Sequence, residues 1–128
     1  MNLPGTKFWP DFQDKILLLE TSLNEDGNKG VPLDKVRAQL ASLRNLNVFT
    51  AIKGLVVGRP AHYDDEQNHE FRQIILNQTR GTDFPILVDV DIGHTTPVLT
   101  IPLNTMVHLD SVSSTFSILE HSVETKRR

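Results

Sequence analysis

The chain has 128 residues, which is the length of one domain, and its 38% hydrophobic content suffices for a core. A formal net charge of -3 without a basic stripe argues against binding to a nucleic acid polymer. Because the chain has no cysteine, disulfides, thiolate zinc sites and a cysteine nucleophile are excluded. The longest early apolar run, at 16–19, is too short for a signal peptide or a membrane span, so we expect a cytoplasmic protein that does not bind membranes.

The N-terminal part of the chain predicts an irregular lead-in, one strand and a loop. Residues 1–14 mix proline, glycine and aromatic side chains and follow neither helical nor strand periodicity. Residues 15–20 form a short continuous apolar run, typical of a strand covered on both faces, and the run ends at Glu20. The polar residues 21–30 predict an exposed loop. We therefore expect Glu20 at the carboxyl end of a strand.

The middle of the chain predicts alternating helices and strands. Pro32 opens an amphipathic helix, and a second helix follows the acidic pair Asp64 and Asp65, which suits a helix N-terminus. Two apolar runs, at 52–58 and 84–90, predict strands. The apolar positions at helical spacing are Val36, Leu40 and Leu43 in the first helix, and Phe71, Ile74 and Ile75 in the second. This order of elements predicts an α/β fold with a mostly parallel central sheet and two helices.

The C-terminal part predicts a small antiparallel set of strands. Residues 98–101 have the β-branched composition of a strand, and residues 105–109 and 115–119 have the alternation of one. Asn104, which tolerates a positive φ, is expected in a tight hairpin turn between the first two of these segments. The basic residues 126–128 are expected to form a solvated terminus.

Two side chains at strand ends suggest acid–base chemistry. Glu20 ends the first strand, and His94 follows Gly93 in a turn after the third strand. If the two strands are neighbours in one sheet, carboxylate and imidazole converge on one edge, as the orienting acid and the base of a hydrolytic triad do. No Gly-x-Ser-x-Gly elbow occurs in the chain. Either the serine lies elsewhere, or the pair is structural.

A second group of polar side chains admits a metal site. Its members are His62, Asp64, Asp65 and His69, with Asp89, Asp91 and His94 as distant members. The ligand spacing of metallohydrolases is absent, and the group crowds the polar start of a helix. We therefore expect no metal, and we expect His108 and His121 at the surface.

Four motifs along the chain are similar to those of a known family. Residues 3–10 resemble a Gly-Thr-x-aromatic-x-Pro lead-in, and residues 15–20 resemble an Ile-Leu-Phe-Leu-Glu strand. Residues 54–59 resemble a Gly-Ile-(Ile/Leu)-x-Gly strand, and residues 91–102 resemble a Gly-His-Thr-x-Pro block. The chain thus resembles the C-terminal domain of the LD-carboxypeptidase family of serine peptidases, most closely its microcin-immunity branch of MccF-like proteins.

The resemblance implies a swivelling β/β/α domain and a triad of serine, glutamate and histidine. Glu20 and His94 stand where the family has its glutamate and histidine, and the serine belongs to an N-terminal domain. Residues 1–128 would then be a C-terminal domain without its nucleophile domain, inactive alone and in need of neither a metal nor an organic cofactor. The chain departs from the family at Thr21, where an acidic residue is usual, at Asn104, and in a lengthened loop at 24–30.

For the complete protein the resemblance implies amide hydrolysis. The substrate would be an L,D-peptide bond of a murein (peptidoglycan) peptide or the amide of a microcin-type aminoacyl nucleotide, and the Gly-His-Thr-x-Pro block favours the second. His94 would act as base and then as acid, with Glu20 orienting it. A homodimer is also implied, and Phe8, Trp9 and Phe12 would be exposed without the N-terminal domain. The alternative is a non-catalytic binding or interaction domain.

Overall fold

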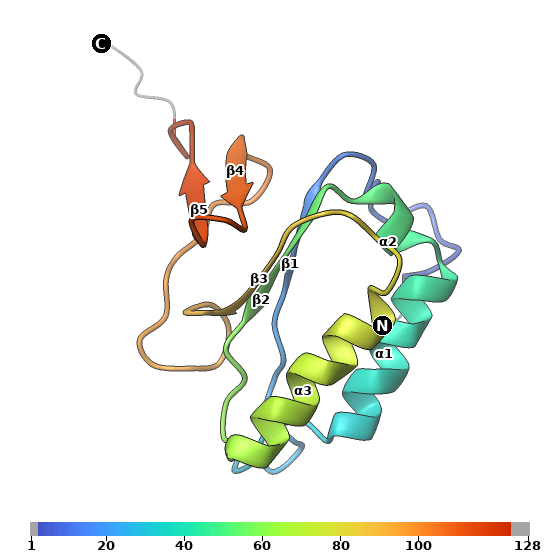
Figure 1. Cartoon of the computed structure of the whole chain (residues 1–128), viewed down its shortest axis with the longest axis vertical. Coiled ribbons are helices and arrows are strands. Elements are labelled where there is room, and N and C mark those ends of the chain that lie inside the picture. The colour runs from blue at the N-terminus through green and yellow to red at the C-terminus, as the bar shows by residue number, and fades with distance from the viewer. Residues whose placement is uncertain (1–2, 124–128) are drawn as a thin grey trace.

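A three-stranded parallel sheet, in the order β1-β2-β3, lies at the centre of the fold (Figure 1). A computed structural model describes residues 3–123 of the chain. Its elements in chain order are β1 (Ile16–Leu19), α1 (Leu33–Asn45), α2 (Val48–Ala51), β2 (Gly54–Gly58), α3 (Asp65–Gln78), β3 (Ile86–Val90), β4 (Val107–Asp110) and β5 (Thr115–Ile118). Strands β4 and β5 pair in an antiparallel hairpin.

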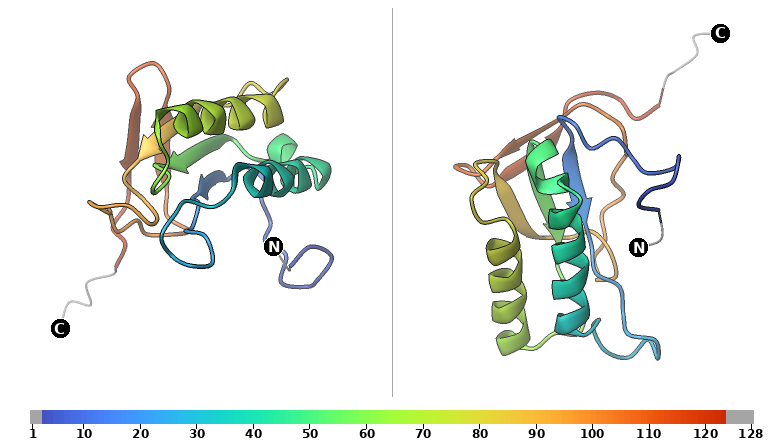
Figure 2. Two further views of the ribbon diagram at one scale, coloured as in Figure 1. Left: turned by 90° about the horizontal axis from the view of Figure 1, so that it is seen from below. Right: turned by 90° about the vertical axis from the view of Figure 1, so that its right-hand side faces the viewer.

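The central sheet is covered on its two faces by different layers. Helices α1 and α3 lie on one face, as both views in Figure 2 show, and the β4–β5 hairpin packs on the other. Strand β2 is buried along its whole length, and its residues alternate between the layers. Leu55 and Val57 pack with the helices, while Val56 packs with Leu109 of β4. The predicted α/β fold, with its parallel sheet and small C-terminal antiparallel set, is confirmed as a β/β/α arrangement.

Local sequence explains where helix α3 begins. The Asp64 carboxylate accepts a hydrogen bond from the Gln67 backbone N–H (2.8 Å), and the Gln67 side chain accepts one from the Asp64 N–H (3.1 Å). This capping box satisfies two backbone donors that a helix N-terminus otherwise leaves unpaired. The predicted inner face is also correct, because Phe71, Ile74 and Ile75 are each 1% exposed.

Between α1 and β2 the structure contains a third helix that the sequence pattern did not predict. Asn47 adopts a left-handed conformation (φ 59°) that ends α1, and α2 then forms a single turn. Four residues are too few to show helical periodicity. Burial holds this turn in place, since Val48 and Phe49 are 1% and 3% exposed.

The predicted strand at 98–101 is wrong, and so is the hairpin turn that was to follow it. No strand pairing is found at 98–101, and Val98 and Leu99 are 58% and 56% exposed. β-branched composition alone does not form a strand, which also needs a continuous ladder of hydrogen bonds to a neighbouring backbone. Asn104 does have the predicted positive φ, of 58°, but in a turn outside the hairpin.

The one hairpin of residues 3–123 instead turns at Asp110, between β4 and β5. The Asp110 carboxylate accepts hydrogen bonds from the Ser113 hydroxyl and from the backbone N–H groups of Val112 and Ser113. These bonds, that of the Ser113 hydroxyl first, lower the pKa of Asp110. The hairpin is therefore closed by a side chain rather than by a two-residue turn.

Three further expectations concern membrane-spanning helices, the basic C-terminal segment and the N-terminal aromatic side chains. No helix within residues 3–123 has both the length and the apolar character needed to cross a membrane. The basic segment 126–128 lies outside the described residues. Of the three N-terminal aromatic side chains, Phe8 is exposed, but Trp9 and Phe12 are half-buried against the core and contact each other edge to face.

Candidate active site

Glu20 and His94 meet at the carboxyl ends of the parallel strands. The His94 Nδ1 and Glu20 Oε2 atoms are 2.8 Å apart, and the two side chains are 46% and 42% exposed. An ionised carboxylate can only accept, so the hydrogen of this bond lies on Nδ1, and in a neutral imidazole the other ring nitrogen, Nε2, is then an acceptor. Strands β1 and β3 belong to one sheet but are not neighbours, because β2 lies between them. The pair therefore bridges across the end of the middle strand.

Two glycines make this bridge possible. A Cβ atom at Gly58, the last residue of β2, would lie 2.6 Å from the carbonyl oxygen of Ile92 and 3.4 Å from the Glu20 Cβ. A Cβ atom at Gly93 would lie 2.6 Å from Glu20 Oε2, and Gly93 has a φ of +96° that L-residues rarely adopt. The sequence analysis noted Gly93 as a turn residue and Gly58 as the last glycine of the Gly-Ile-(Ile/Leu)-x-Gly motif, but it did not connect Gly58 with the contact between Glu20 and His94.

A β-bulge in β3 sets the direction of the segment that carries His94. Leu87 pairs with Val56 and Val90 with Gly58, so β3 has one residue more than β2 between these two pairs. The extra residue is near Asp89, which has a positive φ of 61°. Val88 consequently packs with the helices and Val90 with the hairpin layer, although regular alternation would place them on one face.

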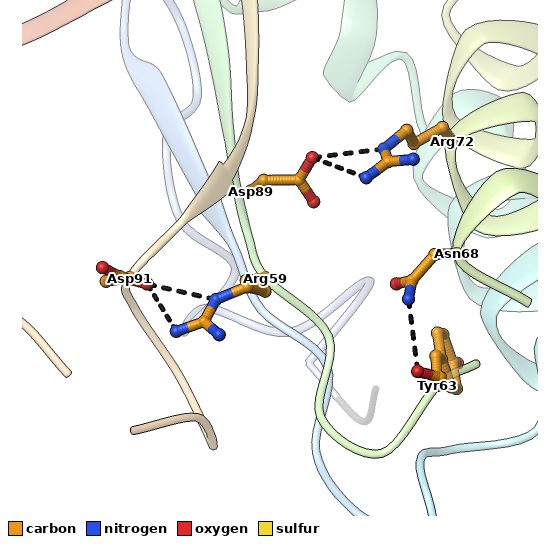
Figure 3. A network of polar contacts seen from close by, with 6 residues as sticks. All are labelled: Arg59, Tyr63, Asn68, Arg72, Asp89 and Asp91. Atoms are coloured by element: carbon orange, nitrogen blue, oxygen red, sulfur yellow. Dashed lines mark hydrogen bonds and ion pairs between the residues drawn. The ribbon is translucent and has the colours of Figure 1, made fainter. Parts of the chain in front are cut away.

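Two arginine–aspartate ion pairs flank the end of β3 (Figure 3). Arg59, directly after β2, donates from Nε (3.1 Å) and Nη2 (2.6 Å) to Asp91 Oδ1. Arg72 of α3 donates from Nε (3.2 Å) and Nη2 (2.9 Å) to Asp89 Oδ2. Sequence reasoning treated both aspartates as distant metal ligands and did not single out either arginine. Neither arginine has a local signal for this role, since only the fold brings each to its carboxylate.

A polar hollow of about 540 Å³ opens beside the imidazole. Its lining includes Arg59, Asn68, Arg72, Asp89, His94 and Thr95. The Thr95 hydroxyl oxygen is buried and has no hydrogen-bond partner among the described residues. None of the described residues that line the hollow is a serine or a cysteine. The hollow thus offers hydrogen-bonding groups and an imidazole next to an open space, but no serine hydroxyl from the described residues.

Tyr63 closes one wall of this hollow. Its hydroxyl donates to the carbonyl oxygen of Val31, and its ring contacts Phe71 edge to face. Burial, followed by the negative charge of Glu70, raises the pKa of Tyr63 from 10.0 to about 12.

We expect Tyr63 to ionise at a higher pH in the folded protein than in the unfolded chain, because its surroundings favour the protonated hydroxyl. Its raised pKa means that the contribution of Tyr63 to stability is complete below pH 10 and is lost as the pH rises from 10 toward 12. Tyr63 is the only tyrosine of the chain, so the ultraviolet absorbance of tyrosinate reports it alone. A midpoint near pH 10 in the folded protein would contradict this prediction.

The candidate metal ligands do not come together. Among residues 3–123, no group of three or more histidine, aspartate or glutamate side chains is placed to hold a metal ion. Asp64 caps α3, and Asp89 and Asp91 are paired with arginines. His108 and His121 are exposed, as expected.

The fold and the pair define a class of protein domain: a β/β/α domain that presents a hydrogen-bonded carboxylate and imidazole at the carboxyl ends of its parallel strands. The sequence profile of the LD-carboxypeptidase C-terminal domain matches residues 1–109. The chain therefore belongs to this family, which confirms the resemblance seen in its motifs.

Two curated relatives carry the name "Putative carboxypeptidase". YocD of Bacillus subtilis is 25% identical over 116 residues, and a protein of Treponema pallidum is 23% identical over 120 residues. These alignments cover 91% and 94% of this chain but only 34% of each relative. The chain thus spans about a third of the length of the curated relatives it matches.

Solved structures of the microcin C7 self-immunity protein MccF have a similar fold. One, in complex with glutamyl sulfamoyl guanosine, has a TM-score of 0.75, and a mutant in complex with adenosine monophosphate has a TM-score of 0.74. Both are 22% identical to this chain, and each alignment covers 95% of this chain and 35% of the solved one.

Proposed function

We propose that this chain supplies the general base and its orienting carboxylate to a serine carboxypeptidase whose nucleophile lies in a separate N-terminal domain. The observation that carries the proposal is the 2.8 Å hydrogen bond between His94 Nδ1 and Glu20 Oε2. Both side chains stay partly exposed, so the free ring nitrogen of His94 is accessible to another domain. A carboxylate and an imidazole in this order are two of the three parts of a hydrolytic triad.

Each group would have a defined task in amide hydrolysis. His94 Nε2 accepts the proton of the serine hydroxyl as its oxygen attacks the amide carbonyl. The imidazolium then donates that proton to the leaving amine, and a water molecule, activated in the same way, releases the acyl group. Glu20 holds the Nδ1–H tautomer and stabilises the imidazolium. Apart from the water molecule, these reaction steps use only groups of the two domains.

The family membership supports an amide substrate of one of two kinds. These are an L,D-peptide bond in a murein peptide and the amide of a microcin-type aminoacyl nucleotide. Similarity of fold to MccF, solved with adenosine monophosphate and with glutamyl sulfamoyl guanosine, favours the aminoacyl nucleotide. The hollow of about 540 Å³ beside His94 provides room for part of such a ligand.

The proposal predicts that the chain alone hydrolyses neither substrate, because the proposal places the nucleophilic serine in the other domain. The test is to combine the chain with the N-terminal domain of a family member such as YocD, to isolate the complex, and to assay both substrates. Hydrolysis by the complex, and by neither domain alone, supports the proposal. A complex that forms and binds a substrate without cleaving it supports the alternative of a non-catalytic binding domain.

Cytoplasmic location and a homodimer complete the proposal. Phe8, which is 67% exposed, is the N-terminal aromatic side chain available for self-association. Sedimentation of the chain over a range of concentrations, with Phe8→Ser as the comparison, tests the dimer. A monomer at all concentrations would contradict it.

A further inference from the structure

Arg59 contacts both ends of the segment that carries His94. At the start of this segment the Arg59 backbone N–H donates to the carbonyl oxygen of Val90 (2.8 Å), and its guanidinium donates to Asp91. At the end, Arg59 Nη2 lies 3.4 Å from the carbonyl oxygen of Thr96, to which it donates. One side chain thus joins the two ends of residues 91–96, with His94 between them.

Apart from Arg59, this segment is anchored near its start, where the Ile92 side chain is buried beside Val56 and Leu109 and its N–H donates to the carbonyl oxygen of Val90 (2.7 Å). The part that carries His94 has fewer contacts. It forms neither helix nor strand, and it contains Gly93, whose positive φ lets the chain turn sharply. Its backbone is closed by a hydrogen bond from the Leu99 N–H to the carbonyl oxygen of Asp91 (2.7 Å). The imidazole of His94 makes its hydrogen bond to Glu20, which is itself partly exposed. A single bond between two exposed side chains does not by itself hold a ring in one orientation.

We propose that Arg59 is a positioning residue for His94: it holds residues 91–96 so that the imidazole keeps its Nδ1–H toward Glu20 and its Nε2 toward the open side. The catalytic consequence of this positioning rests on the proposed function, whereas the contacts of Arg59 do not depend on it. A planar guanidinium suits the task because it donates in two directions at once, to a carboxylate and to a carbonyl. A lysine at this position has one nitrogen and cannot reproduce both contacts.

The same ion pair contributes little to overall stability, because the Arg59 and Asp91 side chains are 41% and 38% exposed. Loss of the pair should therefore act locally. Arg72 and Asp89, which line the same hollow as Arg59 and His94, pair with each other. Arg37 of α1 and Glu70 of α3 form an ion pair of similar length (2.8 Å, against 2.6 Å for Arg59 and Asp91) that does not involve residues 91–96, and they provide a matched control.

The test uses the 128-residue chain itself and reads the His94 ring by ¹H–¹⁵N correlation spectroscopy. In the native chain we expect one tautomer, with hydrogen on Nδ1. Arg59→Ala should give a mixture of tautomers and raise the exchange rate of the Leu99 amide by about tenfold, as expected when a local closure is lost. Arg59→Lys should give an intermediate result, and Arg37→Ala should leave both readouts unchanged.

A second variant keeps the inference testable if Arg59→Ala does not fold. Asp91→Asn removes the partner charge while keeping its size, and it should give the same mixed tautomers. A native imidazole signal in folded Arg59→Ala or in Asp91→Asn would overturn the inference. Because these readouts need no activity, that result would leave the proposed function standing. In the two-domain complex, the expected loss for Arg59→Ala is about 10- to 100-fold in kcat, as for a base held out of place.

Discussion

In the complex with a serine domain, His94→Ala should lower kcat by about 10⁴-fold or more, and Glu20→Gln by about 10³- to 10⁴-fold. The first change removes the only group that can take the serine proton. Glu20→Gln keeps the size of the side chain but removes the carboxylate charge that fixes the Nδ1–H tautomer of His94. The two groups are 2.8 Å apart. Steady-state kinetics with the cleaved substrate measures both effects. The double variant should lose no more than His94→Ala alone, because the two residues act as one unit.

His108→Ala is the matched control for this experiment. His108 is an exposed histidine on β4, in the hairpin layer, and it takes no part in the Glu20 contact. It should keep the native kcat. Equal activity of His94→Ala and the native complex would exclude His94 as the base, and the non-catalytic alternative would then become the better interpretation of the pair.

Gly58→Ala should damage stability and the site together. The new Cβ would lie 2.6 Å from the backbone oxygen of Ile92, which cannot move without shifting the turn that leads to His94. Overpacking of this kind typically costs about 1 to 3 kcal/mol, which denaturant unfolding can measure. A shift of the turn by an ångström should also lower kcat of the complex by about 100-fold.

Gly54→Ala, in the same strand, provides the comparison. There the new Cβ would lie 2.9 Å from Leu109 Cδ2, the movable end of a side chain, and farther from any backbone. We expect a smaller loss of stability and a native signal from His94. If Gly58→Ala left both the unfolding midpoint and the activity unchanged, the contact between Glu20 and His94 would not depend on the absence of a side chain at position 58.

Several elements of this fold follow from the sequence because local physics specifies them. Helices α1 and α3 were predicted from apolar positions at helical spacing. The start of α3 was predicted from Asp64 and Asp65, because acidic side chains suit a helix N-terminus. Strands β1, β2 and β3 were predicted from short apolar runs, since a strand covered on both faces is mostly apolar. The places of Glu20 and His94 at strand ends followed from the same runs.

Other elements depend on contacts that no local pattern contains. The four residues of α2 are helical because Val48 and Phe49 are buried there. Residues 98–101 do not form a strand, because the single bond from the Leu99 N–H to Asp91 does not continue as a ladder. The β-bulge near Asp89 is invisible in Val88-Asp89-Val90, whose alternation reads as a regular strand. Only the register against β2 reveals that Val90 has changed sides.

The sequence by itself determined the two groups of the candidate site, because a carboxylate and an imidazole at strand ends are readable one strand at a time. The tertiary structure alone decided how they meet. Strand order places β2 between them, Gly58 leaves room for Glu20 to pass its end, and Arg59 joins the ends of the segment that carries His94. These contacts join residues far apart in the chain, so they form only when the sheet has folded.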